Sequence, residues 1–345
     1  MGVDLGDLAV KHTMTLDSLS GKIIAIDSYN ILYQFLSSIR QEDGRPLMDF
    51  KGNITAHLSG LFYRTSKLIE NGIKPVYVFD GKPSNLKAKT IAQRVEAKKL
   101  AAEKWKDAIE EGRMDDAKKY AQGSSKLTLE MVEECKKLLS AMGVPTVQAP
   151  GEGEAQASIM VEKGLAYATG SQDYDVLLFG SPILVRNLSI TGRRKVPRQE
   201  RFIVVEPEQI NLKETLASLE LTREQLIRLG LLLGTDFNEG VKGVGPKTAF
   251  KIITQTKNLQ EMVAYVKTKY NYDFEVELTE VIDLFMNPKY NDVENPKWNE
   301  PDIDAVTKIL VDDHDFSADR VQSTMVNLQK ILKERGAQSK LDQWF

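Results

Sequence analysis

Continuous apolar runs near the start of the chain predict a parallel α/β sheet. Residues 22–27 form an apolar run that ends at Asp27, and the run at residues 75–79 is followed by Asp80. Such runs are typical of strands that are buried on both faces. Between them lie residues 31–40, which have a helical pattern, and a second helical segment around residues 53–71. A strand, a helical crossover and a second strand indicate parallel pairing.

Later short runs extend this predicted sheet. We expect further strands at residues 146–148, 166–169, 176–179 and 183–186, and part of a hairpin at residues 199–205 with a basic tip at residues 191–198. After Pro207 the pattern is mostly helical, and a glycine-rich turn at residues 240–246 separates two apolar helices. Residues 287–301 are rich in Asn and Pro and predict an extended loop. The fold class is therefore a mainly parallel central sheet flanked by helices.

Residues 84 to about 139 differ in character from the rest of the chain. They are rich in Lys, Glu and Ala, and they contain few large apolar residues before Leu127. Gly112 and residues 122–125 interrupt the helical pattern, which predicts two or three helices that project from the sheet and bury little surface. A solvated helical hairpin without a function is the alternative.

Composition excludes several classes of protein. The 345 residues are 42% hydrophobic, which is enough for a sizeable core, and no apolar run approaches the roughly 18 residues that span a bilayer. The N-terminus has acidic residues where a secretory signal needs basic ones. A single cysteine excludes an internal disulfide and a multi-cysteine zinc site, and the three histidines are scattered. Any bound metal must therefore be held by oxygen.

Charge is distributed unevenly along the chain. The formal net charge is −3, yet residues 82–106 carry eight basic residues against two acidic ones. Residues 193–201 add five basic residues against one acidic residue. Local positive segments of this kind suit contacts with phosphate despite the acidic total.

Acidic residues recur at positions where a sheet builds its sites. Asp27 and Asp80 lie just beyond predicted strands, at the edge where open α/β sheets bind ligands. Two further acidic pairs, whose members are two residues apart, lie beside glycines or a strand end. One more acid follows an apolar helix. The full candidate set is Asp27, Asp80, Glu152, Glu154, Asp173, Asp175 and Asp236.

These acids predict a metal cofactor. Seven converging carboxylates would repel one another unless cations neutralised them, and hard oxygen ligands select Mg²⁺ or Mn²⁺. Two such ions about 3.5–4 Å apart can stabilise both the attacking and the leaving oxygen of a phosphodiester hydrolysis. The alternative for each acid taken alone is a helix N-cap or a turn residue.

With these motifs in order, the sequence resembles the flap endonuclease family of structure-specific 5′ nucleases nearly end to end. The matching strings are residues 26–28, 76–83, 149–155, 171–175, 233–236 and 243–247. The resemblance implies a PIN-like 5′ nuclease fold over residues 1–330, with an arch at about 84–135 and a helix-two-turn-helix element at about 225–256. It also implies that the same seven acids hold two Mg²⁺ ions, which Mn²⁺ can replace.

The resemblance gives further residues a role. Lys87 and Arg94, seven residues apart on one helical face, match catalytic positions that contact the scissile phosphate. Tyr33 matches a position on which a base stacks, and a core tyrosine is the alternative. The glycine-rich turn is expected to grip duplex DNA through its backbone, with K⁺ as an implied ligand. The implied DNA contacts are Gly2, Tyr33, Arg40, Gly243, Gly245, Lys247 and Lys251.

The C-terminal residues resemble a peptide that binds the sliding clamp (PCNA). We expect residues 331–345 to form a tail, mobile over its last ten residues, that carries this peptide at residues 338–345. Trp344 departs from the more usual Phe or Tyr, which affects affinity or clamp choice. The implied contact residues are Gln338, Leu341, Trp344 and Phe345.

The resemblance implies a structure-specific 5′ flap endonuclease with 5′ to 3′ exonuclease activity. Its expected substrate is branched or nicked DNA with a 5′ flap, in Okazaki fragment maturation and in repair. We expect a monomer in the cytoplasm, or in the nucleus of a eukaryote. The alternatives are a related nuclease for bubbles or four-way junctions, and a non-catalytic scaffold bound to the clamp.

Overall fold

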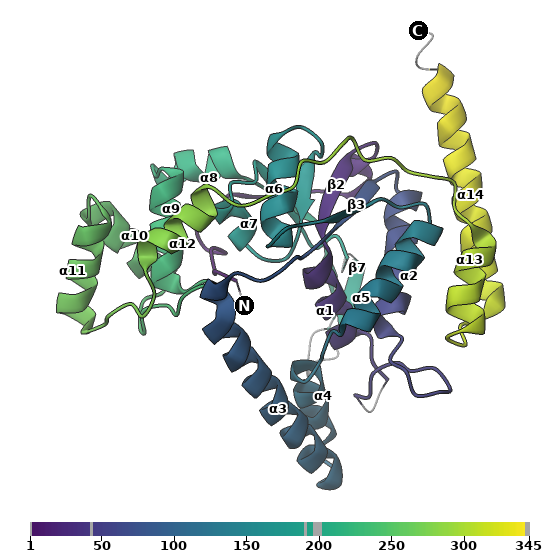
Figure 1. Cartoon of the computed structure of the whole chain (residues 1–345), viewed down its shortest axis with the longest axis horizontal. Helices are drawn as coiled ribbons and strands as arrows, with labels where there is room; N and C mark the ends of the chain where they lie inside the picture. The colour runs from purple at the N-terminus through teal and green to yellow at the C-terminus, as the bar shows by residue number, and fades with distance from the viewer. Residues whose placement is uncertain (1, 42–43, 190–191, 196–201, 342–345) are drawn as a thin grey trace.

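The computed structural model describes residues 2–41, 44–189, 192–195 and 202–341. Its centre is a seven-stranded sheet in the order β1-β9-β6-β5-β2-β3-β4 (Figure 1). The five strands from β6 to β4 pair in parallel, and β9 pairs antiparallel with β6 and β1. The strands are β1 (Lys11–Thr13), β2 (Ile23–Asp27), β3 (Lys74–Phe79), β4 (Thr146–Gln148), β5 (Ala168–Gly170), β6 (Ile183–Arg186) and β9 (Glu208–Asn211).

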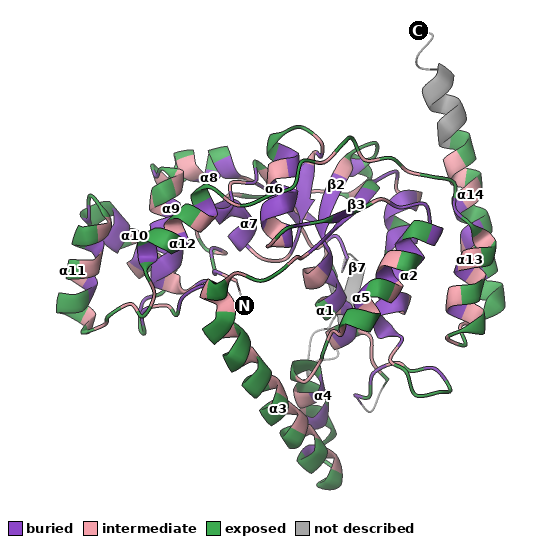
Figure 2. Cartoon of the chain, in the orientation of Figure 1, coloured by how far each residue is buried: buried purple, intermediate pink, exposed green. Residues whose placement is uncertain are grey.

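Helices cover both faces of the sheet, as the continuous apolar strands predict. Ile24, Ile26 and Tyr77 pack with the helices of one face, whereas Ala25 and Val76 pack with α6 on the other. The strands are buried between these layers (Figure 2). The covering helices are α1 (Ser28–Ser38), α2 (Ala56–Glu70) and α5 (Leu129–Ala141) on the first face and α6 (Gly153–Glu162) on the second.

One prediction of secondary structure is wrong. Residues 176–179, predicted as a strand, belong mainly to the short helix α7 (Asp175–Leu178). All four residues of that helix are buried, and a short buried run has no periodicity that separates a strand from a helix. The region after Pro207 is mostly helical, as predicted, but it also contains the strand β9, which was not predicted. Only Ile210 of its four residues is buried, which is too little alternation to indicate a strand.

The charged segment forms a projecting helical hairpin, as its composition predicts, and its role as an arch stays a prediction. It consists of η2 (Asn85–Lys87), α3 (Ala88–Glu110) and α4 (Met114–Gly123), and most of its surface is exposed (Figures 1 and 2). The projecting part ends before residue 135, because Val132 and Cys135 of α5 pack in the main core. α4 also contacts α1, so both ends of the hairpin rest on the body of the protein.

A second group of helices lies beside the sheet and has its own core (Figure 1). It contains the segment for which a helix-two-turn-helix element is predicted, in which Gly243 adopts a φ of +85° that favours glycine. An extended strap, residues 287–301, then leads across the molecule to the C-terminal helices. The helices of this group are α8 (Leu212–Leu219), α9 (Arg223–Leu233), α10 (Pro246–Gln255), α11 (Leu259–Tyr270) and α12 (Leu278–Met286).

The predicted hairpin pairs β7 (Gly192–Lys195) with β8 (Phe202–Val205), and its basic tip lies outside the described residues. At the C-terminus, α13 (Ile303–Thr307) and η3 (Lys308–Asp312) precede α14 (Ala318–Leu341). Mobility of the last ten residues stays a prediction: α14 continues through Leu341, and residues 342–345 lie outside the described residues. Within the described residues, no helix is both long enough and apolar enough to span a membrane.

Candidate active site

The carboxyl ends of four neighbouring strands meet at one edge of the sheet and place the predicted acids together. Asp27 ends β2, Asp80 follows β3, and the two acidic pairs follow β4 and β5. Asp236 reaches the same place from the segment after α9. Six of the seven acids line one cavity of about 400 Å³: Asp27, Asp80, Glu152, Glu154, Asp173 and Asp236.

The seventh acid, Asp175, is buried at the start of α7 and is only 2% exposed. The backbone N–H of Val3 donates a hydrogen bond of 2.7 Å to its Oδ1. A Cβ atom on Gly2 would lie 3.0 Å from its Oδ2. The start of the chain therefore packs directly on this carboxylate, which leaves little room for a side chain at position 2.

Backbone groups hold the carboxylates in place. Asp27 caps α1 by accepting the N–H of Asn30 at 3.1 Å, and the hydroxyl of Ser171 donates to its other oxygen at 3.2 Å. Asp80 accepts the N–H of Gly153 at 2.6 Å. A Cβ atom on Gly153 would lie 2.5 Å from the Asp80 oxygen, so this contact requires glycine.

Burial and mutual repulsion disfavour the charged form of these acids. Burial, followed by repulsion from Asp80, raises the pKa of Asp27 to about 8. Burial and repulsion from Asp236 raise the pKa of Asp175 to about 7. Burial and nearby carboxylates also raise the pKa of Glu154 well above its usual range. The cavity thus concentrates more negative charge than its hydrogen bonds offset.

Two cations from the projecting hairpin reach into the cavity. The ammonium of Lys87 pairs with Glu152 and lies 3.2 Å from an oxygen of Asp236. The guanidinium of Arg94 pairs with Asp236. Burial alone would raise the pKa of Asp236, but Lys87 and Arg94 lower it below its usual range. These side chains therefore act as internal counter-ions for part of the acidic cluster.

The donor set fits a divalent cation. All the candidate ligands are carboxylate oxygens, and Oε1 of Glu152 is buried without a hydrogen-bond partner. In the part of the chain that the structure describes, no three acidic, histidine or cysteine side chains already form a coordination shell. The carboxylates instead share the cavity with Lys87 and Arg94. Hard oxygen ligands and unrelieved negative charge match Mg²⁺ and Mn²⁺.

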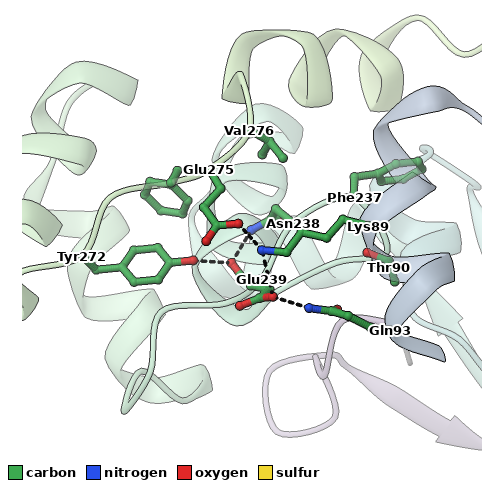
Figure 3. A pocket seen from close by; sticks show the side chains of 10 residues that line it. Lys89, Thr90, Gln93, Phe237, Asn238, Glu239, Tyr272, Glu275 and Val276 are labelled. Atoms are coloured by element: carbon green, nitrogen blue, oxygen red, sulfur yellow. Dashed lines mark hydrogen bonds and ion pairs between the residues drawn. The ribbon is translucent and has the colours of Figure 1, made fainter. Parts of the chain in front are cut away.

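Contacts outside the cavity anchor the base of α3 (Figure 3). Lys89 points between Glu239 and Glu275, and its ammonium lies 3.3 Å from a Glu239 oxygen. The amide of Gln93 donates to Glu239 at 2.6 Å, and the hydroxyl of Tyr272 donates to the Glu239 backbone oxygen at 3.1 Å. Arg94 therefore extends from a helix, and Lys87 from its N-cap, and the first turns of this helix are attached to the segment that follows Asp236.

Tyr33 and Arg40 occupy different environments. Tyr33 is 36% exposed and lines the acidic cavity, so it is not the core tyrosine that was considered as an alternative. The ammonium of Lys98 lies 4.2 Å from its ring centre. The guanidinium of Arg40, for which DNA contact stays a prediction, donates to Ser125 at 2.6 Å and to the carbonyl of Gly44 at 2.9 Å. These bonds tie α1 to the end of the projecting hairpin.

The remaining candidates lie away from the cavity. Lys247 and Lys251 are exposed on α10, one turn apart, and Gly243 and Gly245 face open space in the turn before it. Gln338 and Leu341 are residues of α14, and the structure describes only their backbone. The remaining two clamp-peptide residues, Trp344 and Phe345, lie outside the described residues.

Sequence reasoning missed the polar residues that support the acids. Asn30 donates its side-chain amide to Asp173 at 2.8 Å, and Ser171 bonds to both Asp27 and the backbone of Asp173. Asn30 stands three residues after Asp27, which is the spacing of a helix cap and its backbone donor. That spacing could have indicated its bond to Asp27, but nothing local indicates its contact with Asp173.

Known proteins resemble this chain over its whole length. The sequence matches the XPG N-terminal domain over residues 3–101 and the XPG I-region over residues 143–236. It is 50% identical to the flap endonuclease 1 of Aeropyrum pernix, with 100% of both chains covered. It is 49% identical to that of Pyrococcus furiosus, with 100% of this chain and 99% of the relative covered.

Solved structures agree with these relatives. The flap endonuclease-1 from Methanococcus jannaschii superposes with a TM-score of 0.75 at 41% identity, covering 97% of this chain and 100% of the other. The catalytic core of Rad2 in complex with DNA substrate gives a TM-score of 0.71 at 25% identity, covering 95% of this chain and 100% of the other.

The fold, the acidic cavity and the XPG matches together define a metal-dependent nuclease that acts on phosphodiester bonds. Within this class, about half of the residues of this chain are identical to those of the two relatives over the full length, and this identity shows the family. The chain belongs to the flap endonuclease 1 family.

The raised pKa values predict how stability depends on pH. In EDTA, we expect the melting temperature to fall as the pH rises from about 5 to about 8. Folded Asp27 and Asp175 keep their protons to pH values of about 8 and about 7, whereas unfolded carboxyl groups lose them near pH 4. The folded state therefore binds more protons in this range, and raising the pH favours unfolding. Calorimetry in a pH series measures the slope.

The matched variants are Asp27→Asn, which removes one of these protonation sites, and Asp107→Asn, which changes an exposed carboxyl on α3. We expect Asp27→Asn to flatten the slope and Asp107→Asn to leave it as in the wild type. A wild-type melting temperature that stays constant or rises over this range would contradict the raised pKa values of Asp27 and Asp175.

Proposed function

We propose that this protein is a structure-specific 5′ flap endonuclease with 5′ to 3′ exonuclease activity, acting in Okazaki fragment maturation and in repair. The observation that carries the proposal is the cavity in which acids from separate strand ends meet two cations of the projecting hairpin. The relatives named flap endonuclease 1 support this activity, and we propose that the enzyme is cytoplasmic and monomeric. Nicked or branched DNA with a 5′ flap is the proposed substrate.

Two Mg²⁺ ions, replaceable by Mn²⁺, are the proposed cofactors. The seven acids would hold them, because these residues supply only oxygen donors and carry charge that the fold leaves partly unbalanced. When bound, such ions supply a water of lowered pKa and stabilise charge on the reacting phosphate. No histidine or cysteine lines this cavity as the structure describes it, which agrees with chemistry that needs no nucleophilic side chain.

Two cationic residues of the hairpin would contact the scissile phosphate. Lys87 and Arg94 already meet carboxylates in the cavity, and a phosphate carries the same sign of charge and the same acceptor oxygens. We infer that they exchange these carboxylates for the scissile phosphate and offset the charge that develops on it. Tyr33, exposed beside them, offers a ring face on which any adjacent base can stack.

Duplex DNA would be gripped away from the cavity. The turn before α10 is open at Gly243 and Gly245, and Lys247 and Lys251 extend its positive side. Such a turn can bind backbone phosphate directly or through K⁺, without reading sequence. Selectivity would then come from the shape and flexibility of branched DNA.

A substrate panel tests the proposal against its nearest competitor. The nearest alternative is a related nuclease that acts on bubbles or four-way junctions. Cleavage of matched flap, bubble and junction substrates should be fastest on the flap in Mg²⁺ and absent in EDTA. A preference for bubbles or junctions would replace the proposed substrate, and binding without any cleavage would indicate a scaffold.

Removing a buried acid should abolish catalysis. We expect Asp27→Ala and Asp175→Ala to cleave a 5′ flap at least roughly 10³-fold more slowly in Mg²⁺, because each removes a candidate ligand from the metal centre. Binding to the flap in Ca²⁺, measured by fluorescence anisotropy, should stay within a few-fold of the wild type. Asp304→Ala, an exposed acid of α13, is the control. Wild-type rates for both buried variants would end the proposal.

Removing Lys87 should affect turnover more than binding. We expect Lys87→Ala to lower kcat by roughly 10²–10³-fold, the range observed when a preorganised donor to a developing charge is lost. The KM for the flap should change little, because one phosphate contact is a small part of the interface. Lys99→Ala on α3, the helix that Lys87 caps, is the matched control in single-turnover and steady-state kinetics, because its side chain is 68% exposed. Equal losses in both variants would contradict a specific role for Lys87.

We also propose that residues 338–345 bind the sliding clamp through an apolar plug and an anchoring glutamine. Substituting both Trp344 and Phe345 with Ala should weaken clamp binding at least roughly tenfold, since the plug buries most of the apolar area. Cleavage of free DNA should not change. Lys340→Ala, between the proposed anchors, is the control in surface plasmon resonance. Full clamp binding by the double variant would refute this interaction.

A further inference from the structure

Asn30 connects acids that come from two different strands. It is the third residue of α1 and lines the acidic cavity. Its backbone N–H donates to Asp27 at 3.1 Å, and its side-chain Nδ2 donates to Asp173 at 2.8 Å. Asp27 ends β2, whereas Asp173 follows β5. One residue therefore bonds to two candidate metal ligands that are far apart in the sequence.

A third bond determines which way the Asn30 amide faces. The backbone N–H of Gln172 donates to Oδ1 of Asn30 at 3.2 Å. A backbone N–H can only donate, so the atom that faces it must be the amide oxygen. The amide nitrogen then faces Asp173, where it can only donate. The loop that carries Asp173 therefore orients the Asn30 amide so that its nitrogen donates to the Asp173 carboxylate.

A neutral amide suits this position better than a cation. Lys87 and Arg94 show that a cation in this cavity pairs with carboxylates and offsets their charge. An amide donates one hydrogen bond and adds no charge, so the carboxylate keeps its attraction for a metal ion. Its remaining lone pairs also stay available, because a carboxylate can accept about four hydrogen bonds or ligand contacts.

We propose that Asn30 is a positioning residue that sets the separation and orientation of Asp27 and Asp173 for metal binding. This inference rests on the proposed two-metal function of the cavity. Residues that orient metal ligands typically change metal affinity or activity by 10–100-fold when they are removed. Asn30 orients its two partners through different groups, the backbone for Asp27 and the side chain for Asp173, so a side-chain substitution loosens Asp173 selectively.

The test replaces the amide by an apolar side chain of similar shape, Asn30→Leu, and by a small one, Asn30→Ala. Calorimetric titration with Mn²⁺ alone, without DNA, should show affinity reduced by about 10–100-fold in both variants. In cleavage assays, the Mg²⁺ concentration for half-maximal rate should rise by a similar factor. At saturating Mg²⁺ the rate should largely recover, and the KM for DNA should not change.

Gln34→Ala is the matched control, because Gln34 lies one turn further along α1 and its amide oxygen accepts a hydrogen bond from Ser189. It should retain wild-type Mn²⁺ affinity. Circular dichroism and melting in EDTA show whether each variant is folded, and two variants of different size guard against a packing defect in one of them.

Three outcomes decide between the hypotheses. Folded Asn30 variants that bind Mn²⁺ within twofold of the wild type would overturn the positioning role while leaving the proposed function intact. Unchanged Mn²⁺ affinity together with a slower rate at saturating Mg²⁺ would also overturn it, because Asn30 would then act on the substrate. A wild-type protein that binds no Mn²⁺ would overturn the proposed function itself, and this inference with it.

Discussion

Repulsion among buried carboxylates is the constraint on which this structure depends. Asp27 and Asp175 are almost completely removed from water, and neighbouring acids raise their pKa values further. A fold can keep such groups together only if donors and cations offset part of the charge. Here the donors are backbone N–H groups, as from Val3 and Gly153, and the cations come from the hairpin. The remaining imbalance is what makes the cavity a binding site for a divalent ion.

The parallel sheet explains how residues so far apart in sequence reach one place. Neighbouring parallel strands end at the same edge, so β5, β2, β3 and β4 each deliver acids there without any long connection through the core. The hairpin α3–α4 is inserted directly after this edge, in the connection between β3 and β4. Its basic residues therefore begin within a few residues of the acids, and its exposed length does not disturb the packed layers.

The sequence predicted the strands and their terminal acids well because both signals are local. An apolar run followed by an aspartate needs no knowledge of distant residues, and β4 and β6 agree with their predicted bounds. The short helix α7 was predicted as a strand, and the strand β9 was not predicted, because four residues carry too little periodicity. The partners of Arg40 and Asn30 depend on how separate loops meet. Such contacts are properties of the tertiary structure, which no single motif encodes.

The pairing of Lys87 and Arg94 with the acids has a consequence for biogenesis. Because the chain carries its own positive charges to this edge, a newly made molecule can complete its fold before it encounters any divalent ion. Many small metalloproteins lack this option, since their ligands stay unfolded until the ion arrives. Synthesis and metal loading are thereby separated in time, and a cell with a fluctuating supply of Mg²⁺ would still accumulate folded protein that is ready to be activated.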